Sequence, residues 1–313
     1  MNIIVLYNTP DSDEPSDIDT KNSAIAVCEG LNKIPDFKAE LMPVTQNEIE
    51  KLKNLKTDFV FNLLEWTGHN AKYSYEVMDI LISLNIPYSG AHKSGQELSD
   101  NKILMKNKFL ELKIPTPKFQ IYDTRFIENE LNFPVIAKLT YEHCSLGLDE
   151  SNIVSNAEDL RSKILDLRSK YDMPVLVEEY VEGDEVQVGV IEKGRVLPPQ
   201  RIVFTKNQKI LSHGTKWGDQ EDNSAWGDFD ALAPSVKYQV TELAKKTYEN
   251  LGGRSYARVD MRVNSSGVYV LEINNNPGID WDDDNALCKS AKAGGFASFP
   301  DFLKTIVYDA LTN

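Results

Sequence analysis

Two segments near the end of the chain alternate apolar and polar residues and are separated by a short turn. They are Arg258–Val263 and Val270–Asn274, with Ser265–Gly267 between them. Alternation with a period of two predicts half-buried strands, and a short turn of small residues predicts that they pair as an antiparallel hairpin. We therefore expect a sheet with one apolar face and one polar face.

The polar face of this hairpin has the composition of a metal site. Arg258 and Asp260 share one face of the first strand, and Glu272 and Asn274 share one face of the second. Two carboxylates and an amide oxygen then converge beside an arginine, and hard oxygen ligands of this kind suit Mg²⁺. The alternative is a ladder of ion pairs on the surface of the hairpin.

An acidic segment in the middle of the chain is a candidate nucleoside site. The stretch Val175–Glu185 is an apolar strand that runs into two acids, with a further acid after a glycine turn. Backbone groups there could meet an adenine edge, and a carboxylate could accept both ribose hydroxyls. The alternative is a solvated acidic strand end.

Three separate lysines are candidate phosphate ligands, because lysine binds phosphate as a point charge. Lys102 lies in a predicted helix, and Lys216 lies in the long polar loop Ser212–Asp230. Lys138 ends the apolar strand Val135–Leu139, where a lysine needs a charge partner and a phosphate would serve. A lone lysine is otherwise an ordinary surface residue.

The rest of the chain alternates strands and helices. The apolar runs Ile3–Tyr7 and Asp58–Leu64, followed by a helix at Glu76–Leu84, predict a βαβ unit in a small parallel sheet. A further helix is expected over Glu97–Leu112, with Ser99 and Asp100 as good N-cap residues. At 313 residues, two or three domains are expected.

The composition excludes several classes of protein. The net charge of −14 repels phosphate backbones, which argues against a nucleic-acid partner. The three cysteines, Cys28, Cys144 and Cys288, show no CxxC spacing, so we expect reduced thiols in the cytoplasm. The chain has no signal-peptide pattern, and no apolar run approaches the roughly 20 residues of a membrane span.

Taken in order, these segments resemble the ATP-grasp superfamily, and specifically D-alanine–D-alanine ligase and its relatives. The carrying segments are Ile86–Gly90, Asp100–Lys102, Ile114–Pro117, Pro134–Lys138, Val175–Glu185, Val196–Pro198, Arg201–Ile202, Lys216–Trp217, Arg258–Asp260 and Leu271–Gly278. The resemblance implies an α/β (α+β) ATP-grasp fold, in which a small N-terminal parallel-sheet domain precedes two α+β lobes that clasp ATP. The expected domains are 1–96, 97–181 and 182–313.

The resemblance also implies a role for each matching residue. For ATP, the implied phosphate ligands are Lys102 and Lys138, the adenine contacts are Ile136, Glu178, Glu179, Tyr180, Val181 and Leu271, and the ribose ligand is Glu185. The implied magnesium ligands are Asp260, Glu272 and Asn274, and the implied catalytic residues are Arg258, Lys216 and Ser145. Mn²⁺ is an expected substitute for Mg²⁺.

The substrate-facing positions depart from the family pattern. The glycine-rich first loop has no clear counterpart in Asn8–Pro15, and Glu65-Trp66 replaces a His-Gly pair. Trp217 replaces the tyrosine after the loop lysine. The hydroxyl-bearing stretch that receives the second substrate's carboxylate is replaced by Asp280–Asp284, which includes Asp282 and Asp283. Consecutive aspartates repel a carboxylate, which favours a cationic acceptor; alternatively they only cap the next helix.

The resemblance implies an ADP-forming carboxylate–amine ligase that joins small amino-acid-like substrates through an acyl phosphate. The alternatives are a genuine D-alanine–D-alanine ligase of cell-wall synthesis, an enzyme that phosphorylates a small molecule without forming an amide, and a non-catalytic nucleotide-binding module. The expected partners are small molecules, with no nucleic acid and no membrane. The resemblance is compatible with a homodimer.

Overall fold

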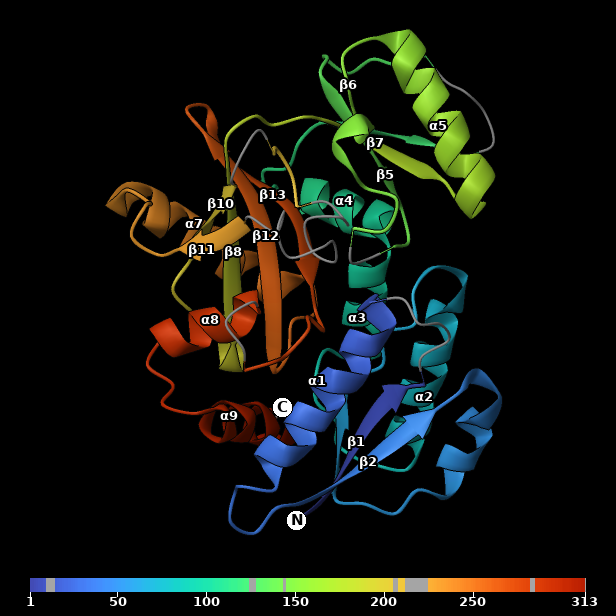
Figure 1. Cartoon of the computed structure of the whole chain (residues 1–313), viewed down its shortest axis with the longest axis vertical. Helices are drawn as coiled ribbons and strands as arrows, with labels where there is room; N and C mark the ends of the chain where they lie inside the picture. Colours follow the sequence, from blue (N-terminus) through green and yellow to red (C-terminus); the bar gives the residue numbers. More distant parts are fainter. Residues whose placement is uncertain are drawn as a thin grey trace.

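Three β-sheets succeed one another along the chain, and Figure 1 shows them around a central pair of helices, α3 and α4. This computed structural model describes residues 1–9, 15–123, 128–142, 145–204, 208–211, 225–281 and 285–312. The mixed fold class expected from the sequence is confirmed, with one small parallel sheet and two antiparallel sheets.

The elements have the following bounds. The strands are β1 Asn2–Asn8, β2 Lys38–Val44, β3 Phe59–Asn62, β4 Phe119–Tyr122, β5 Val135–Leu139, β6 Ile153–Val154, β7 Val175–Glu179, β8 Asp184–Ile191, β9 Arg195–Val196, β10 Gln200–Phe204, β11 Ala225–Asp228, β12 Tyr256–Asn264 and β13 Gly267–Asn274. The helices are α1 Pro15–Leu31, η1 Gln46–Asn54, η2 Gly68–Asn70, α2 Ala71–Ser83, α3 Lys93–Asp100, α4 Lys102–Glu111, η3 Glu150–Asn152, α5 Ala157–Tyr171, η4 Glu192–Gly194, α7 Pro234–Asn250, α8 Ala286–Ala293 and α9 Phe299–Thr312.

The N-terminal sheet has the order β2-β1-β3, and both pairs of strands are parallel. Strands β1 and β3 are largely buried on both faces, whereas the edge strand β2 is partly exposed, with Leu41 41% exposed. Ile3 and Val5 pack against α1, whereas Leu6 and Val60 pack against η1 and α2. A parallel strand covered on both sides carries a continuous apolar run, so the predicted βαβ unit is confirmed.

The central sheet has the order β4-β7-β5-β6, and α5 covers one of its faces. Val135, Ala137 and Val177 point to α5 and are fully buried. Successive side chains of a strand alternate faces, so Lys138 and Glu178 point to the other face. Because the apolar side chains of β5 and β7 pack on α5, Lys138 and Glu178 lie on the face of the sheet opposite α5.

The C-terminal sheet has the order β11-β10-β8-β12-β13, and α7 packs on its apolar face. Val188 and Val259 lie opposite each other on β8 and β12 within this core. The predicted hairpin around Ser265–Gly267 is confirmed, since β12 and β13 pair as antiparallel strands. The opposite face of the sheet carries polar side chains.

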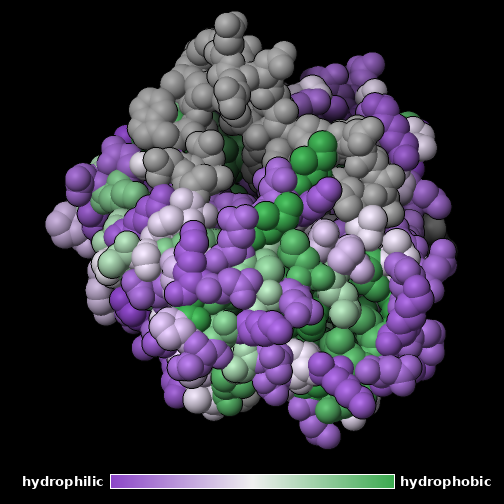
Figure 2. Space-filling model, turned by 60° about the horizontal axis from the view of Figure 1, so that its bottom comes forward, coloured by the Kyte–Doolittle hydropathy of each residue, from purple (hydrophilic) through white to green (hydrophobic). Residues whose placement is uncertain are grey.

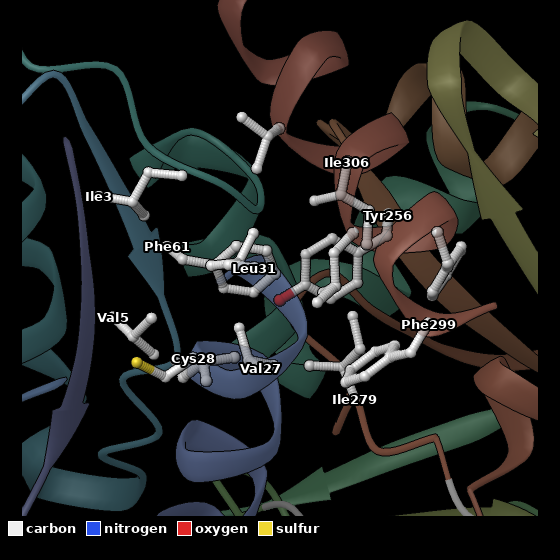
Figure 3. Close-up of a cluster of buried hydrophobic side chains, with 14 of the residues drawn as sticks. Ile3, Val5, Val27, Cys28, Leu31, Phe61, Tyr256, Ile279, Phe299 and Ile306 are labelled. Carbon is white, nitrogen blue, oxygen red and sulfur yellow. The ribbon is translucent and has the colours of Figure 1, made fainter. Parts of the chain in front are cut away.

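A shared core joins the two ends of the chain. Figure 3 shows Val5, Leu31 and Phe61 of the N-terminal part meeting Tyr256 and Ile306 of the C-terminal part, and all five are buried. This core brings α1 beside α9. The N-terminal sheet is thereby held against the end of β12 that begins at Tyr256.

One predicted helix is divided in the structure. We expected a single helix over Glu97–Leu112, but α3 ends at Asp100 and α4 begins at Lys102. The N-cap is Asn101, not Ser99 or Asp100, and its side chain accepts from the backbone N–H groups of residues 103 and 104. Asparagine is as good an N-cap as aspartate, so the pattern alone could not choose between them.

The surface is that of an ordinary polar protein. Figure 2 shows hydrophilic residues over much of this face, with hydrophobic residues gathered from its centre toward the right. Among the described residues, no helix combines the length and apolar character needed to cross a lipid bilayer.

Candidate active site

One face of β12 carries a row of four polar side chains. Tyr256, Arg258, Asp260 and Arg262 alternate with residues of the α7 core, so they lie on the face turned away from α7. At about 3.3 Å per residue, the row is roughly 20 Å long. The strand therefore orders four different functional groups along a single line.

A β-bulge in β13 adds two more groups to this face. Asp260 pairs with Glu272 but Met261 pairs with Val270, so Leu271 is the extra residue. The bulge allows Val270 and Ile273 both to face the α7 core. Glu272 and Asn274 then lie opposite Asp260 and Arg258 on the polar face.

Arg258 and Asp260 form a two-pronged ion pair along the strand. Nε of Arg258 lies 2.8 Å from Oδ1 of Asp260, and Nη2 lies 2.9 Å from Oδ2. Both side chains are mostly buried. Such a fork fixes the carboxylate in one orientation, which a single contact cannot do.

The predicted metal ligands are brought together on one face. Asp260 and Glu272 are direct cross-strand partners, and Asn274 is next on the same face. Among the residues that the structure describes, no group of three His, Cys, Asp or Glu side chains could hold a metal ion. The predicted set contains only two carboxylates, and its third member is an amide. Their role as metal ligands stays a prediction.

Lys102 approaches Glu272 from the start of α4. Its Nζ lies 3.0 Å from Oε2 of Glu272 and donates to the carbonyl of Glu142 at 2.9 Å. Its backbone N–H donates to the carbonyl of Thr140, which follows β5. The first predicted phosphate lysine thus lies beside a predicted metal ligand, and their roles stay predictions.

Lys138, the second predicted phosphate lysine, lies beside a buried carboxylate. Its Nζ is 2.8 Å from Oε2 of Glu178, which is on the adjacent strand β7. The other oxygen of Glu178 lies 2.5 Å from Nζ of Lys106 on α4. Glu178, predicted to contact adenine, therefore carries its side chain between two lysines.

These two lysines control the protonation of Glu178. Burial alone would raise the pKa of its carboxyl group, but the charges of Lys106 and Lys138 outweigh burial and lower the pKa to about 2. Burial lowers the pKa of Lys106, and Glu178 opposes that effect. For Lys138, Glu178 and Glu272 outweigh burial and raise the pKa. Glu178 is thus a permanent anion near neutral pH.

Sequence reasoning missed Lys106, although the sequence held a signal. Lys102, Met105, Lys106 and Phe109 form the buried side of α4, at spacings of three and four residues. A lysine within an apolar stripe needs a charge partner, because an unpaired buried ammonium is costly. The spacing could have indicated that Lys106 has a charged partner, but it could not have identified that partner as Glu178.

The predicted ribose ligand, Glu185, is paired with an arginine at the far end of the row. Nη2 of Arg262 lies 2.8 Å from Oε2 of Glu185, its direct partner across β12 and β8. The guanidinium also donates to the carbonyls of Gly183 and Lys209 and lies over the ring of Tyr180. Arg262 was also missed, although it continues the alternation of Arg258 and Asp260.

The remaining predicted nucleotide residues lie on β5, on β13 and at the end of β7. Ile136 is buried directly opposite Glu178, and Leu271 is the bulged residue of β13. The carboxylate of Glu179 accepts hydrogen bonds from the backbone N–H and the side chain of Asn132. Val181 follows β7 and is half-buried.

Ser145 bridges the two lobes. Its Oγ donates to the carbonyl of Leu211 at 2.8 Å, and its φ of 63° is in the left-handed region. A positive φ is uncommon for serine and is held by the surrounding structure. The other predicted loop residues, Lys216 and Trp217, lie outside the described residues, as do Cys144, Asp282 and Asp283.

The Tyr256 end of the row meets the segment that follows β3. The hydroxyl of Tyr256 donates to Oδ1 of Asn276 at 2.6 Å, and Nδ2 of Asn276 donates to the carbonyl of Leu64. Burial and the nearby charge of Glu65 raise the pKa of Tyr256. The predicted substrate residue Glu65 therefore lies near this end of the row.

A second contact joins α1 to the loop after β13. Oγ of Ser23 donates to Oδ2 of Asp280 at 2.5 Å, and Oγ1 of Thr20 donates to Oε2 of Glu65 at 3.3 Å. Two carboxylates, Glu65 and Asp280, thus lie along the inner side of α1. Of the acidic stretch Asp280–Asp284, the structure therefore describes Asp280, which lies beside α1.

Known proteins resemble this chain in sequence. Residues 111–308 match the family described as D-ala D-ala ligase C-terminus. The D-alanine–D-alanine ligase of Desulforudis audaxviator is 31% identical over 244 residues, which cover 74% of this chain and 75% of that protein. D-alanine–D-alanine ligase A of Bacillus cereus is 30% identical over 282 residues, which cover 88% of each.

A solved structure shares the whole fold. The D-alanine–D-alanine ligase from Bacillus anthracis complexed with ATP superposes with a TM-score of 0.80 at 24% identity. The superposition covers 100% of this chain and 98% of that one. The three-sheet arrangement is therefore the one that this ligase uses.

Proposed function

The chain belongs to the D-alanine–D-alanine ligase family, and from this premise we propose that it joins the carboxylate of one small amino acid to the amine of a second small molecule. Membership makes it an ATP-dependent, ADP-forming ligase with an ATP-grasp fold. The observation that carries the proposal is the row on β12. In that row, Arg258 lies between Arg262, which pairs with the proposed ribose ligand Glu185, and Tyr256, which lies near Glu65.

The proposed reaction has two steps. A carboxylate oxygen of the first substrate attacks the γ-phosphorus of ATP, which forms an acyl phosphate and releases ADP. The amine nitrogen of the second substrate then attacks the acyl carbon, phosphate leaves, and the nitrogen loses a proton. Phosphorylation is needed because an oxide anion is a poor leaving group and a phosphate is a good one.

The nucleoside end supports ATP binding through a pair of buried carboxylates. Glu178 and Glu185 are each held by a cation, Lys106 and Arg262 respectively. We assign Glu178 to the adenine end and Glu185 to the ribose. Lys102 and Lys138 are the proposed phosphate ligands, since each extends its ammonium beside the polar face of its lobe.

The donor set on the hairpin fits a magnesium ion. Asp260, Glu272 and Asn274 supply hard oxygen atoms from one face, and Mg²⁺ favours one or two carboxylates together with phosphate oxygens. When bound there, the metal neutralises charge on the phosphates of ATP. Arg258 orients Asp260 and presents its guanidinium next to the reacting groups, where it can stabilise the oxyanion of the second step.

The charges near Tyr256 and Glu65 favour an amine substrate that carries no carboxylate of its own. Glu65 and Asp280 both lie where α1 meets the C-terminal lobe, and their charges disfavour an anionic acceptor. We propose an acceptor that carries a cationic group in place of the carboxylate of D-alanine.

A screen for ADP release tests the function. The protein is incubated with Mg-ATP and pairs of D- or L-amino acids, or with one amino acid and a diamine, and products are identified by mass spectrometry. We expect ADP and an amide with at least one pair. The ligase assignment would be falsified if no pair released ADP, and a high rate with D-alanine alone contradicts the cationic acceptor.

A further inference from the structure

We propose that Lys106 is a positioning residue of the nucleotide cleft, which holds the Glu178 carboxylate and the bulged backbone of β13 and so leaves Lys138 available to a phosphate. The proposal rests on the ATP use described above. It concerns a residue that extends from α4, between the central and C-terminal sheets (Figure 1).

Lys106 is itself too enclosed to bind a phosphate. Its side chain is 1% exposed, and three oxygen atoms surround its Nζ. They are Oε1 of Glu178 at 2.5 Å, Oγ1 of Thr116 at 2.7 Å and the carbonyl oxygen of Leu271 at 2.8 Å. Thr116 and Leu271 accept hydrogen bonds from the ammonium, and Glu178 forms an ion pair with it, so little of Lys106 remains for a phosphate.

Lys138 is placed differently on the same carboxylate. Its side chain is 16% exposed, and its Nζ lies 2.8 Å from Oε2 of Glu178. Lys106 and Lys138 together give two positive charges for one negative charge. Lys106 can therefore keep Glu178 neutralised when Lys138 turns to a phosphate.

Without Lys106, Lys138 would have two competing tasks. The Glu178 side chain is 1% exposed, so a departing Lys138 would leave a buried, unpaired carboxylate. Phosphate binding would then oppose the pairing of Glu178. The loss should be specific to ligands that carry phosphate.

The contact with Leu271 adds a geometric role. Leu271 is the extra residue of the bulge, and its neighbour Glu272 is a proposed metal ligand. Thr116 reinforces the contact, because its Oγ1 receives from Lys106 and donates to the carbonyl of Val270 at 2.8 Å. One ammonium thus ties β7 of the central lobe to β13 of the C-terminal lobe.

The test compares two lysines of one helix. Lys106→Met retains most of the apolar stem and removes the charge. Lys108→Met is the matched control, because Lys108 lies two residues after Lys106 and forms an ion pair with the exposed Glu111. Binding of AMP-PNP and of adenosine is measured for each folded protein by isothermal titration calorimetry.

For Lys106→Met we expect a loss of AMP-PNP affinity of about tenfold or more, the usual effect of one charge-assisted contact, and a change in adenosine affinity below about threefold. Lys108→Met should match the wild type with both ligands. An unchanged AMP-PNP affinity in Lys106→Met overturns the proposal. Equal losses for AMP-PNP and adenosine also overturn it, because they indicate a general distortion of the cleft.

A double variant covers the case in which Lys106→Met does not fold. Lys106→Met with Glu178→Gln removes both charges of the buried pair and leaves Lys138 without a carboxylate to neutralise. We expect the double variant to fold and its affinity for AMP-PNP, relative to adenosine, to lie within about threefold of that of Glu178→Gln alone. A double variant whose AMP-PNP affinity is about tenfold below that of Glu178→Gln overturns the proposal. If the wild type itself binds no AMP-PNP, the nucleotide site fails before Lys106 is in question.

Discussion

Arg258 holds Asp260 through two parallel contacts on one strand, with Nε 2.8 Å from Oδ1 and Nη2 2.9 Å from Oδ2. The pair sits at the middle of the polar row, directly opposite Asn274 and Glu272. Arg258 thus orients one proposed metal ligand, Asp260, and faces another, Asn274. In the proposed mechanism this arrangement would couple the second chemical step to the phosphate site.

Replacing Arg258 by lysine tests this coupling. Arg258→Lys keeps the charge but cannot make both contacts to Asp260. We expect kcat to fall by about 10²- to 10³-fold, the typical cost of losing an oxyanion donor, with AMP-PNP affinity changed much less. ADP release and calorimetry measure the two quantities. Arg195→Lys, on the exposed Arg195–Glu192 pair, should behave as wild type. A near-normal kcat in Arg258→Lys contradicts the assigned role.

Glu272→Gln tests the metal site. The substitution retains an oxygen ligand but removes its charge, which weakens the attraction for Mg²⁺. The Mg²⁺ concentration for half-maximal ADP release should rise by about tenfold or more. Glu249→Gln, on the exposed side of α7, serves as control. Identical magnesium titrations for Glu272→Gln and wild type would exclude Glu272 as a ligand.

The buried Arg262–Glu185 pair predicts a strongly non-additive effect on stability. Arg262→Met alone leaves Glu185 buried beside no guanidinium, which should lower the unfolding free energy by about 3–5 kcal/mol. Adding Glu185→Leu removes that charge and should restore part of the loss. Urea unfolding of both single variants and the double variant gives the coupling. Simple additivity of the two single effects would show that the pair is not coupled.

Asp280→Asn tests the acceptor preference. The substitution keeps the size of the side chain and its contact with Ser23 but removes a negative charge. We expect the ratio of kcat/KM for D-alanine to that for a cationic amine to rise by about tenfold. Asp166→Asn, on the surface of α5, should leave the ratio unchanged. A ratio that does not move in Asp280→Asn removes Asp280 from acceptor selection.

Acid stability should depend on Glu178. Its pKa is about 2 in the folded protein, against a usual value of 4.5, so its contribution to stability is present above pH 4.5 and is lost as the pH falls toward 2. Lys106 of α4, Lys138 of β5 and Glu272 of β13 are the charged groups that act around it.

Urea unfolding between pH 5 and pH 3 measures this contribution. In Glu178→Gln, the unfolding free energy should fall less steeply over this range than in the wild type, because the group that titrates is gone. Glu249→Gln, an exposed control, should retain the wild-type slope. Parallel slopes for Glu178→Gln and wild type would disprove the contribution.

Local sequence pattern alone predicted several strands, their faces and one hairpin. The alternation at Arg258–Val263 predicted which side chains share a face, and the turn at Ser265–Gly267 predicted the antiparallel pairing with β13. The buried strands β1 and β3 were recognisable from continuous apolar runs, whereas the partly exposed edge strand β2 was not predicted. These features depend on the period of the strand and on turn chemistry, which a sequence displays directly.

Contacts between distant segments were decided by the tertiary structure. The sequence places Lys106, Glu178 and Leu271 far apart, and only the packing of α4 between two sheets brings them together. The bulge at Leu271 is also invisible in the pattern, yet it determines that Glu272 faces Asp260. The sequence by itself determined which residue types and faces were available. Tertiary packing decided which charges pair, because burial makes each charge depend on a partner that no local spacing specifies.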